Sequence, residues 1–385
     1  RTVKEMNKPV IVAAKRTPFG KYGGALRSLE PEILLKPLFQ HLSEQCPELK
    51  YRTDDVILGN VVGNGGNIAR KSLLEAGWSE TIPGLTLDRQ CGSGLEAIMY
   101  ACRMIQAGAG QIYLAGGVES TSRAPWKIKR PQSVYDTAMP EIYECASFAP
   151  EGQDPSMIEA AENVAQRYDI SREAQDDFAY QTHQRTLQAI EQGHLADEIL
   201  PLTVKGQRVD RDESVKPRLS EKLLSRMKPL ISGGTVTAGN CCMKNDGAVV
   251  LLVMEERTAR ALGYHHGLQF VDGLTHGVDP TLLGIGPIPT VETLLERNRT
   301  RMGDIEAVEL NEAFASQVLA CQRELGISEA QLNRWGGAIA TGHPYGASGA
   351  ALVTRLFNMK CDGLTLATMG IGGGMGNAIL FQPWT

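Results

Sequence analysis

The feature that most constrains the fold is an internal duplication, in which the last part of the chain repeats the pattern of the first part. The corresponding segments are 54–60 with 304–311, 92–95 with 346–350, and 112–117 with 364–374. In each pair the residue types and their order agree, down to the glycines that open a helix or close a strand. Two copies of one β-α-β unit would pack about a pseudo-twofold axis, and corresponding sheet ends would face a shared cleft.

Within each copy, short apolar runs alternate with helical patterns. The run Pro9–Ala14 is continuously apolar and of strand length, which is typical of a strand covered on both faces. Further strands are expected at 54–62, 111–115 and 247–253, and helices at 34–42, 69–76 and 92–107. Strands alternating with helices predict an α/β sheet with helices on both faces.

The segment 121–244 has a different texture. Strand runs are scarce, prolines and charges are more frequent, and helical patterns at 158–168 and 172–193 dominate. We therefore predict an insertion between the two copies. The predicted division is a first half at 1–120, completed by about 245–265, an inserted domain at 121–244, and a second half at 266–385.

A cysteine stands at the turn between an expected strand and an expected helix, within 86–98. A helix N-terminus presents unpaired N–H groups, so Cys91 could have a pKa below the free value of about 8.5 and react as a thiolate. Gly92 and Gly94 leave room beside its sulfur. The alternative is a buried, inert cysteine in a glycine-rich turn, and these residues alone leave both interpretations open.

Composition narrows the classes of function. The chain has 385 residues, 42% hydrophobic and 22% charged, with a net charge of −5, so it shows no basic field that would attract nucleic acid or an anionic membrane. Its 8 cysteines form no CxxC pair or zinc-type spacing, which indicates free thiols and no metal site. No apolar run has the length of a signal peptide or a membrane span, so we expect a cytoplasmic protein.

Five blocks together resemble the signatures of the thiolase family, in order and at family-like spacing. They are Asp-Arg-Gln-Cys-Gly-Ser-Gly-Leu-Glu-Ala at 88–97, Thr-Val-Thr-Ala-Gly-Asn at 235–240, Asn-Asp-Gly at 245–247, Asn-Glu-Ala-Phe-Ala at 311–315, and Gly-Gly-Ala-Ile-Ala-Thr-Gly-His-Pro-Tyr-Gly-Ala-Ser-Gly at 336–349. The similarity runs from about Pro9 to the end. It implies the thiolase fold, with two duplicated, layered α/β halves and an inserted loop domain. It also implies coenzyme A thioesters as substrates, and a homodimer or a dimer of dimers.

The resemblance also assigns catalytic roles. Cys91 resembles the nucleophile that takes up the acyl group, and His343 resembles the imidazole that raises its thiolate fraction. His343, with a water held by Asn311, would stabilise the thioester oxyanion, while the N–H groups of Cys91 and Gly372 match a second oxyanion hole. Outside these blocks, His343 would be read as a core histidine and Asn311 as a helix cap.

One position departs from the family pattern. Thiolases end with a Cys-x-Gly block whose cysteine serves as acid and base for the α-proton, and this chain has Gly370 at that place. General acid–base groups contribute about 10²–10⁴-fold, so Claisen chemistry should be slow or absent unless another group substitutes. The sequence does not say whether the glycine is natural or engineered.

Three substitutes for the missing thiol are conceivable. Cys242 falls where the family usually has a small residue beside the pantetheine chain, although an inert packing thiol is the simpler interpretation. Tyr345 stands where leucine is common and fits a wall of the acyl pocket better than an acid. A bound water in the vacated space is the third option.

Other residues are candidates for binding coenzyme A, which is expected as a substrate and not as a permanently bound cofactor. Lys216 sits where the family often has a phosphate-binding arginine, and solvated surface charge explains it nearly as well. Met157 resembles a residue that lines the pantetheine tunnel, and on its own it would be read as core. The remaining candidates are Arg218 and Lys222 for the phosphates and Ala238 and Cys242 for the pantetheine chain.

Two functions are consistent with this pattern. The first is an acyl-CoA acyltransferase of the thiolase type in fatty acid or lipid metabolism, which forms an acyl-enzyme on Cys91 and is impaired in carbon–carbon chemistry by Gly370. The second is a non-catalytic scaffold or sensor that keeps the fold and the coenzyme A cleft. The retention of Cys91, His343 and Asn311 favours the enzyme, and Gly370 favours the scaffold. Acyl chain length, physiological acceptor, direction of reaction and subunit number are not readable from the residues.

Overall fold

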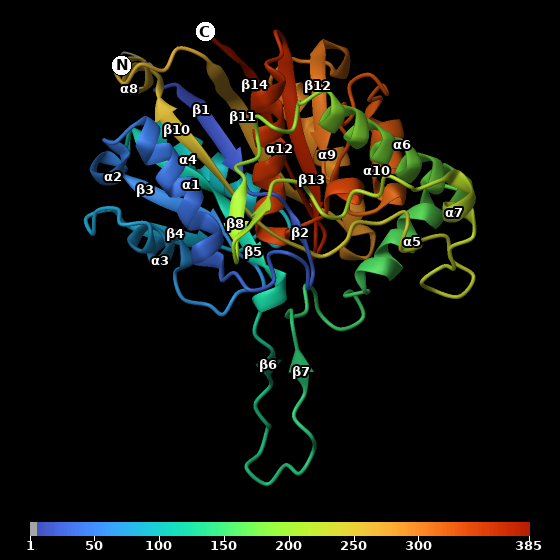
Figure 1. Cartoon of the computed structure of the whole chain (residues 1–385). Coiled ribbons are helices and arrows are strands. Elements are labelled where there is room, and N and C mark those ends of the chain that lie inside the picture. The colour runs from blue at the N-terminus through green and yellow to red at the C-terminus, as the bar shows by residue number, and fades with distance from the viewer. Residues whose placement is uncertain (1–5) are drawn as a thin grey trace.

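A single sheet of ten strands runs through both copies of the repeat in the computed structural model, which describes residues 6–385 (Figure 1). The first five residues of the predicted first half lie outside the described residues. The strand order is β12-β13-β14-β11-β1-β10-β5-β3-β4, with β2 (Gly20–Lys21) paired to β10. The strands of this path are β1 Pro9–Arg16, β3 Asp55–Gly59, β4 Gly84–Leu87, β5 Ile112–Ser120, β10 Asn245–Glu255, β11 Gly267–Gly277, β12 Ile305–Leu310, β13 Leu364–Ile371 and β14 Met375–Trp384.

The helices of the two halves cover both faces of this sheet (Figure 1). In the first half they are α1 Pro31–Gln45, α2 Leu49–Arg52, α3 Ile68–Glu75, α4 Ser93–Gln106 and α8 Glu256–Ala261. In the second half they are α9 Pro287–Arg297, α10 Ala315–Leu325, α11 Ala338–Thr341 and α12 Tyr345–Met359, with short 3₁₀ turns at Pro280–Ile285 and Met302–Asp304. The α/β class predicted from the alternating pattern is therefore confirmed.

The sheet has an internal twofold relation. The first half contains the parallel pair β3–β5, followed by the antiparallel pairs β5–β10 and β10–β1. The second half contains the matching parallel pair β12–β13, followed by the antiparallel pairs β13–β14 and β14–β11. The first half has one further parallel pair, β3–β4, at its edge. The halves meet where β1 runs antiparallel to β11, with Val10 opposite Gln269 and Ile11 opposite Leu268. When the two halves are exchanged, the pair Val10–Gln269 takes the place of the pair Ile11–Leu268. The pseudo-twofold axis predicted from the duplication therefore passes between these two strands.

The strand registers say which residues of the two copies correspond. Gly59 lies opposite Gly117 in the first half, and Leu310 lies opposite Thr368 in the second half. Asn60, which follows Gly59, therefore corresponds to Asn311, which follows Leu310. Glu119, two residues after Gly117, corresponds to Gly370, two residues after Thr368.

Helices α4 and α12 lie together at the centre of the molecule, inside the largest apolar core. A Cβ atom added at Gly94 would lie 2.7 Å from the backbone nitrogen of Ala350, and one added at Gly349 would lie 2.5 Å from that of Leu95. The glycines found in the repeat therefore allow the two helix backbones to touch. A second core fills the space between α1, α3 and the first half of the sheet, and a third fills the space between α9, α10 and the second half.

Residues 121–244 form a layer of helices and long connecting loops beside this framework (Figure 1). The helices are α5 Met157–Arg167, α6 Arg172–Glu191 and α7 Glu221–Ser225, preceded by a 3₁₀ turn at Thr121–Arg123. Two short hairpins also occur here, β6 Lys127–Ile128 with β7 Ile142–Tyr143, and β8 Leu202–Val204 with β9 Gln207–Val209. Their strands have only two or three residues each, too few to show a strand period in the sequence.

Buried ion pairs fix this layer to both halves. Arg16 of β1 binds Asp212 at 2.7 Å and Glu198 at 3.0 Å, and Arg355 of α12 binds Glu198 at 2.8 Å. All four side chains are buried, and their two positive and two negative charges balance. Removing one partner would leave an unpaired buried charge, which is strongly destabilising.

We expect Gly117→Ala to destabilise the protein, because the added Cβ would lie 1.8 Å from the carbonyl oxygen of Gly346. Overpacking of this kind costs about 1–3 kcal/mol or more in the free energy of unfolding. Urea unfolding of both proteins would measure the difference. Gly303→Ala is the control, because nothing lies within 4 Å of a Cβ added there. Equal stability of the two variants would contradict the close approach of α12 to β5.

Candidate active site

The turn that carries Cys91 is held by local hydrogen bonds. The N–H of Arg89 donates to Ser93 Oγ at 2.8 Å, and the Ser93 hydroxyl donates to the carbonyl of Gln90 at 2.5 Å. Gln90 has a φ of 44°, which turns the chain sharply before α4 begins at Ser93. The turn therefore places Cys91 just before the helix, as the sequence predicts.

The sulfur of Cys91 faces the second half of the molecule. The backbone N–H groups of Gly372 and of Cys91 itself lie beside it and act to lower its pKa. Burial nevertheless dominates and raises the pKa of Cys91 to about 11. The expectation that the helix N-terminus would lower this pKa is wrong, because two N–H groups do not offset the loss of solvation. Proton transfer to a partner is thus needed to form the thiolate.

His343 is held in a defined orientation just ahead of α12. The backbone N–H of His343 donates to the carbonyl of Met243 at 3.0 Å, and the ring atom Nδ1 lies 2.5 Å from Ser348 Oγ. When the Ser348 hydroxyl donates its hydrogen to the carbonyl of Pro344 at 3.0 Å, the Ser348 oxygen accepts from Nδ1–H. Nε2 is then the unprotonated nitrogen. It is buried and has no partner within residues 6–385, and burial lowers the pKa of His343 to about 4.

Asn311 follows β12 directly and is the third predicted site residue. Its N–H donates to Thr368 at 3.1 Å, and its Nδ2 is buried without a partner among the described residues. The alternative that Asn311 caps a helix is wrong, because α10 begins at Ala315 with Phe314 at the N-cap and no side-chain cap. An unpaired buried amide is costly, which points to a partner that arrives with the substrate.

Segment 240–244 joins these groups. The N–H of Cys242 donates to Ala313 at 2.9 Å, and Lys244 pairs with His343 as a short parallel bridge. Burial dominates the raised pKa of Cys242, and the nearby thiols of Cys241 and Cys91 raise it further, so Cys242 lies close to Cys91. Segment 240–244 thus links Cys242 to Ala313, two residues after Asn311, and links Lys244 to His343, with Cys91 close to Cys242. These residues form the candidate site.

Tyr345 lies next to His343 in this candidate site. Its ring meets the His343 ring edge to face, with centroids 5.2 Å apart. Burial raises the pKa of the phenol, and the Cys242 and Cys91 thiols are the next largest influences. No hydrogen bond of its hydroxyl is found within residues 6–385. The phenol is therefore a neutral hydrogen-bond donor close to Cys91 and Cys242.

Gly370 lies in β13, opposite Gly376, with no side chain to offer. A Cβ added here would lie 3.0 Å from Gln317 Nε2 and 3.1 Å from the carbonyl oxygen of Gly284. The space beside Gly370 is therefore tight, and a larger side chain would require its neighbours to shift by a few tenths of an ångström.

Glu119 was missed as a functional residue by sequence reasoning. Its carboxylate accepts hydrogen bonds from the N–H groups of Val61 and Val62, both at 3.0 Å, and from that of Gly346 at 2.9 Å. It also accepts from Asn60 Nδ2 at 3.2 Å. Burial raises its pKa to about 7. Glu119 ties the first half to the start of α12. Its only signal in the sequence is its place two residues after the pair Gly116–Gly117, within β5.

The coenzyme A candidates lie in the inserted layer, and the structure leaves their roles as predictions. Met157 opens α5 and is half-buried, and Ala238 and Arg218 are exposed. Lys216 is half-buried, and its N–H donates to His183 Nδ1 at 3.3 Å. Burial lowers the pKa of the Lys216 ammonium, so this side chain is the more constrained of the cationic candidates.

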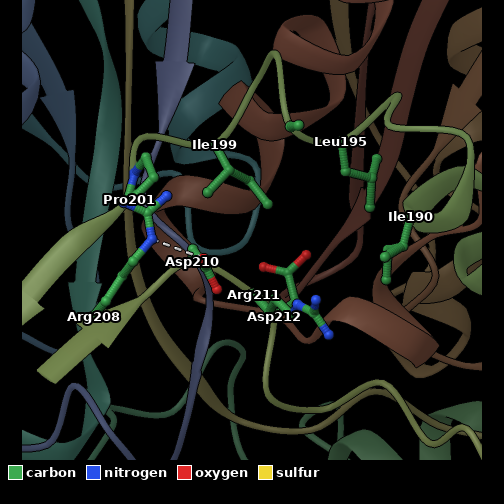
Figure 2. Close-up of a pocket in the computed structure, with 9 residues that line it drawn as sticks. Ile190, Leu195, Ile199, Pro201, Arg208, Asp210, Arg211 and Asp212 are labelled. Atoms are coloured by element: carbon green, nitrogen blue, oxygen red, sulfur yellow. Dashed lines mark hydrogen bonds and ion pairs between the residues drawn. The ribbon is translucent and has the colours of Figure 1, made fainter.

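Several cavities lie away from Cys91. Figure 2 shows one of about 310 Å³, which is lined by Ile190, Leu195, Ala196, Ile199, Pro201, Arg208, Asp210, Arg211 and Asp212. None of the predicted site residues lines it. A small cavity of about 30 Å³, room for about one water, lies behind Asn311, with Glu309 beside it. Burial raises the pKa of Glu309 to about 8, so a neutral carboxyl backs Asn311 at neutral pH.

Comparison with known proteins identifies the class. Residues 9–257 match the family model "Thiolase, N-terminal domain", and residues 267–383 match "Thiolase, C-terminal domain". The chain belongs to the thiolase family. It is 65% identical over 376 residues, 98% of this chain and 99% of the relative, to a Staphylococcus aureus protein named "Putative acetyl-CoA C-acetyltransferase VraB". A Staphylococcus epidermidis protein of the same name is 64% identical over 379 residues, with the same coverage.

Solved thiolase structures agree with the fold. The Bacillus anthracis acetyl-CoA acetyltransferase superposes with a TM-score of 0.93 at 34% identity, covering 98% of this chain and 99% of that one. The human mitochondrial 3-ketoacyl-CoA thiolase in complex with CoA gives 0.92 at 32% identity, covering 98% of each chain. Within residues 6–385, no helix combines the length and apolar character that a membrane crossing requires.

We expect alkylation of Cys91 by iodoacetamide to be slow at about pH 7 and to rise continuously towards about pH 10, because only the thiolate reacts and burial raises its pKa to about 11. Mass spectrometry of the Cys91 peptide would measure the rate, with exposed Cys145 in the same sample as a comparison. A plateau of reactivity between about pH 6 and 9 would instead reveal a resting thiolate–imidazolium pair.

Proposed function

We propose that this thiolase-family protein is an acyl-CoA acyltransferase that forms an acyl-enzyme on Cys91. The observation that carries the proposal is the pair of backbone N–H groups, of Gly372 and Cys91, beside the sulfur, together with a buried His343 Nε2 that has no partner among the described residues. An acyl group on this sulfur would place its carbonyl oxygen near the same two donors, which is the arrangement that stabilises a tetrahedral oxyanion.

The acylation step uses groups already in place. His343 Nε2 accepts the proton of Cys91 as the sulfur attacks the thioester carbonyl, and the resulting imidazolium returns that proton to the departing coenzyme A thiolate. Ser348 accepts from Nδ1–H throughout and holds the ring in place. Because the resting thiol and imidazole are both neutral, the charge appears only during the reaction.

Gly370 limits the carbon–carbon step after acylation. Glu119 is the counterpart of Gly370 in the first half, and it accepts a hydrogen bond from the backbone N–H of Gly346. In the contact between α4 and α12, Gly346 has the position that corresponds to that of Cys91. Residue 370 therefore lies where a side chain would act on the nucleophile, and glycine supplies none. Cys242 and Tyr345 are weak bases as replacements, because burial raises the pKa of both and keeps them protonated. Condensation and thiolysis should be slowed.

The second candidate is a non-catalytic scaffold or sensor that binds coenzyme A or acyl-CoA. The raised pKa of Cys91 and the absence of a side chain at Gly370 favour it. The human mitochondrial 3-ketoacyl-CoA thiolase was solved in complex with CoA, which supports a coenzyme A cleft under either candidate. In that cleft we place Met157, Lys216, Arg218, Ala238 and Cys242. A cytoplasmic role in lipid metabolism is part of the same proposal.

We further propose that the protein assembles as a homodimer or homotetramer. The β6–β7 hairpin projects from the body of the molecule (Figure 1). It carries exposed apolar side chains, including Val134, Tyr135 and Met139, each about nine-tenths exposed. Such a patch on a projecting element is typical of a surface that contacts another protein.

We expect intact-protein mass spectrometry to show a mass gain of one acyl group after mixing with acetyl-CoA or acetoacetyl-CoA. The adduct should map to Cys91 and be absent from Cys91→Ala. Cys102→Ala, which changes a buried thiol further along α4, should retain it. Measurable CoA binding with no adduct would favour the scaffold.

We expect Gly370→Cys to raise the thiolysis of acetoacetyl-CoA by about 10²–10⁴-fold, because it restores an acid–base group. Gly370→Ala is the matched control, since it meets the same neighbours, Gln317 and Gly284, without a thiol. Spectrophotometric thiolysis assays would compare the three proteins. An equal rate in all three would show that the missing thiol is not what limits this reaction.

A further inference from the structure

We infer that the second substrate of this protein is a 2-carboxyacyl thioester of the malonyl-CoA type, and that carbon–carbon bond formation is driven by loss of CO₂. This inference rests on the proposed acyl-enzyme and names the acceptor that the acyl group meets. It answers a chemical question: how a carbanion can form beside Cys91 when Gly370 supplies no side chain to remove an α-proton.

The bases around the cleft are already engaged. Each carboxylate oxygen of Glu119 accepts two hydrogen bonds, one oxygen from Val62 and Asn60 and the other from Val61 and Gly346. Both of its oxygens are therefore occupied, and the protein interior holds them in place.

The other ionisable groups are no better suited. Both oxygens of Glu312 accept from Thr182, and one of them also accepts from Asn333. Cys242 and Tyr345 are kept protonated by burial, and Gly370 has no side chain. His343 offers an unengaged nitrogen, and its position is committed to the thiol and thioester chemistry.

Decarboxylation removes the need for a base. When a 2-carboxyacyl thioester loses CO₂, the electron pair of the carbon–carbon bond stays on the α-carbon, so no proton has to be taken from it. The negative charge moves onto the thioester oxygen as an enolate, which requires hydrogen-bond donors. Asn311 Nδ2 is such a donor, buried and unpartnered among the described residues.

The surroundings of the nucleophile suit this reaction. Phe148 covers Gly372, with ring atoms 2.9 Å from the position of an added Cβ, and Ile371 packs against Gly92. A carboxylate brought into this largely apolar region loses solvation, whereas CO₂ does not. The Tyr345 hydroxyl is kept protonated by burial and has no hydrogen bond within residues 6–385, so it is a donor for orienting the carboxylate as it enters.

The reaction balances without a further reactant. The acyl group on Cys91 and the malonyl-CoA anion give CO₂, 3-ketoacyl-CoA and the Cys91 thiolate. The α-carbon forms its new bond to the acyl carbonyl carbon as the bond to Cys91 sulfur breaks, and the sulfur keeps that electron pair. One proton from solvent then enters through His343 Nε2 and ends on the Cys91 sulfur, which restores the resting thiol.

The test uses the acetyl-enzyme, prepared from acetyl-CoA and freed of CoA, and malonyl-CoA labelled in its carboxyl group. We expect labelled CO₂, acetoacetyl-CoA and deacylated Cys91 in equal amounts. With unlabelled acetyl-CoA in place of malonyl-CoA, we expect product to form at least about 10²-fold more slowly, the contribution typical of a missing acid–base group. Gly370→Cys should speed the acetyl-CoA reaction and so reduce that ratio, whereas Gly370→Ala should not.

Three results would overturn the inference. An acetyl-enzyme that forms normally but releases no more CO₂ from malonyl-CoA than Cys91→Ala does would refute the acceptor alone and leave the acyltransferase proposal standing. Equal rates with acetyl-CoA and malonyl-CoA would show that another base is present. Failure to form any acetyl-enzyme would refute both proposals together, and the mass of the intact protein reports that outcome directly.

Discussion

The contact between α4 and α12 is the constraint on which the rest of the structure depends. These helices meet on the pseudo-twofold axis with Gly94 against Ala350 and Gly349 against Leu95, at distances that exclude side chains. The close approach brings the start of each helix to the sheet edge of the other half, so Cys91 comes to face Gly372. A looser contact between the helices would leave Cys91 on one half and the N–H of Gly372 on the other, too far apart to contact each other.

Burial, more than any pair of charges, sets the electrostatics of the cleft. It raises the pKa of Cys91 and lowers the pKa of His343, so the resting state contains two neutral groups. The same effect keeps Glu309 neutral behind Asn311, while the nearby charges of Arg16 and Arg355 are fully paired.

Much of this could be predicted from sequence, because the information is local or repeated. The duplication predicts the twofold sheet, and the run around Cys91 predicts a strand, a turn and a helix. What could not be predicted depends on segments far apart in the chain. The direction of the Cys91 pKa shift depends on how completely other segments cover it, and the role of Glu119 depends on loop 60–62 reaching the start of α12.

The twofold relation also shows how the two copies have come to differ. In the first copy, the Asn60 amide is satisfied by Glu119, whose other oxygen holds Gly346, so this end of the duplicated unit is sealed by its own side chains. In the second copy, Gly370 stands in place of that glutamate, and the corresponding Asn311 amide has no partner within the described residues. The same arrangement is thus fully hydrogen-bonded in the first half, and in the second half it leaves an amide without a partner among the described residues. The duplication lets the molecule keep rigidity and reactivity in separate copies of the same unit.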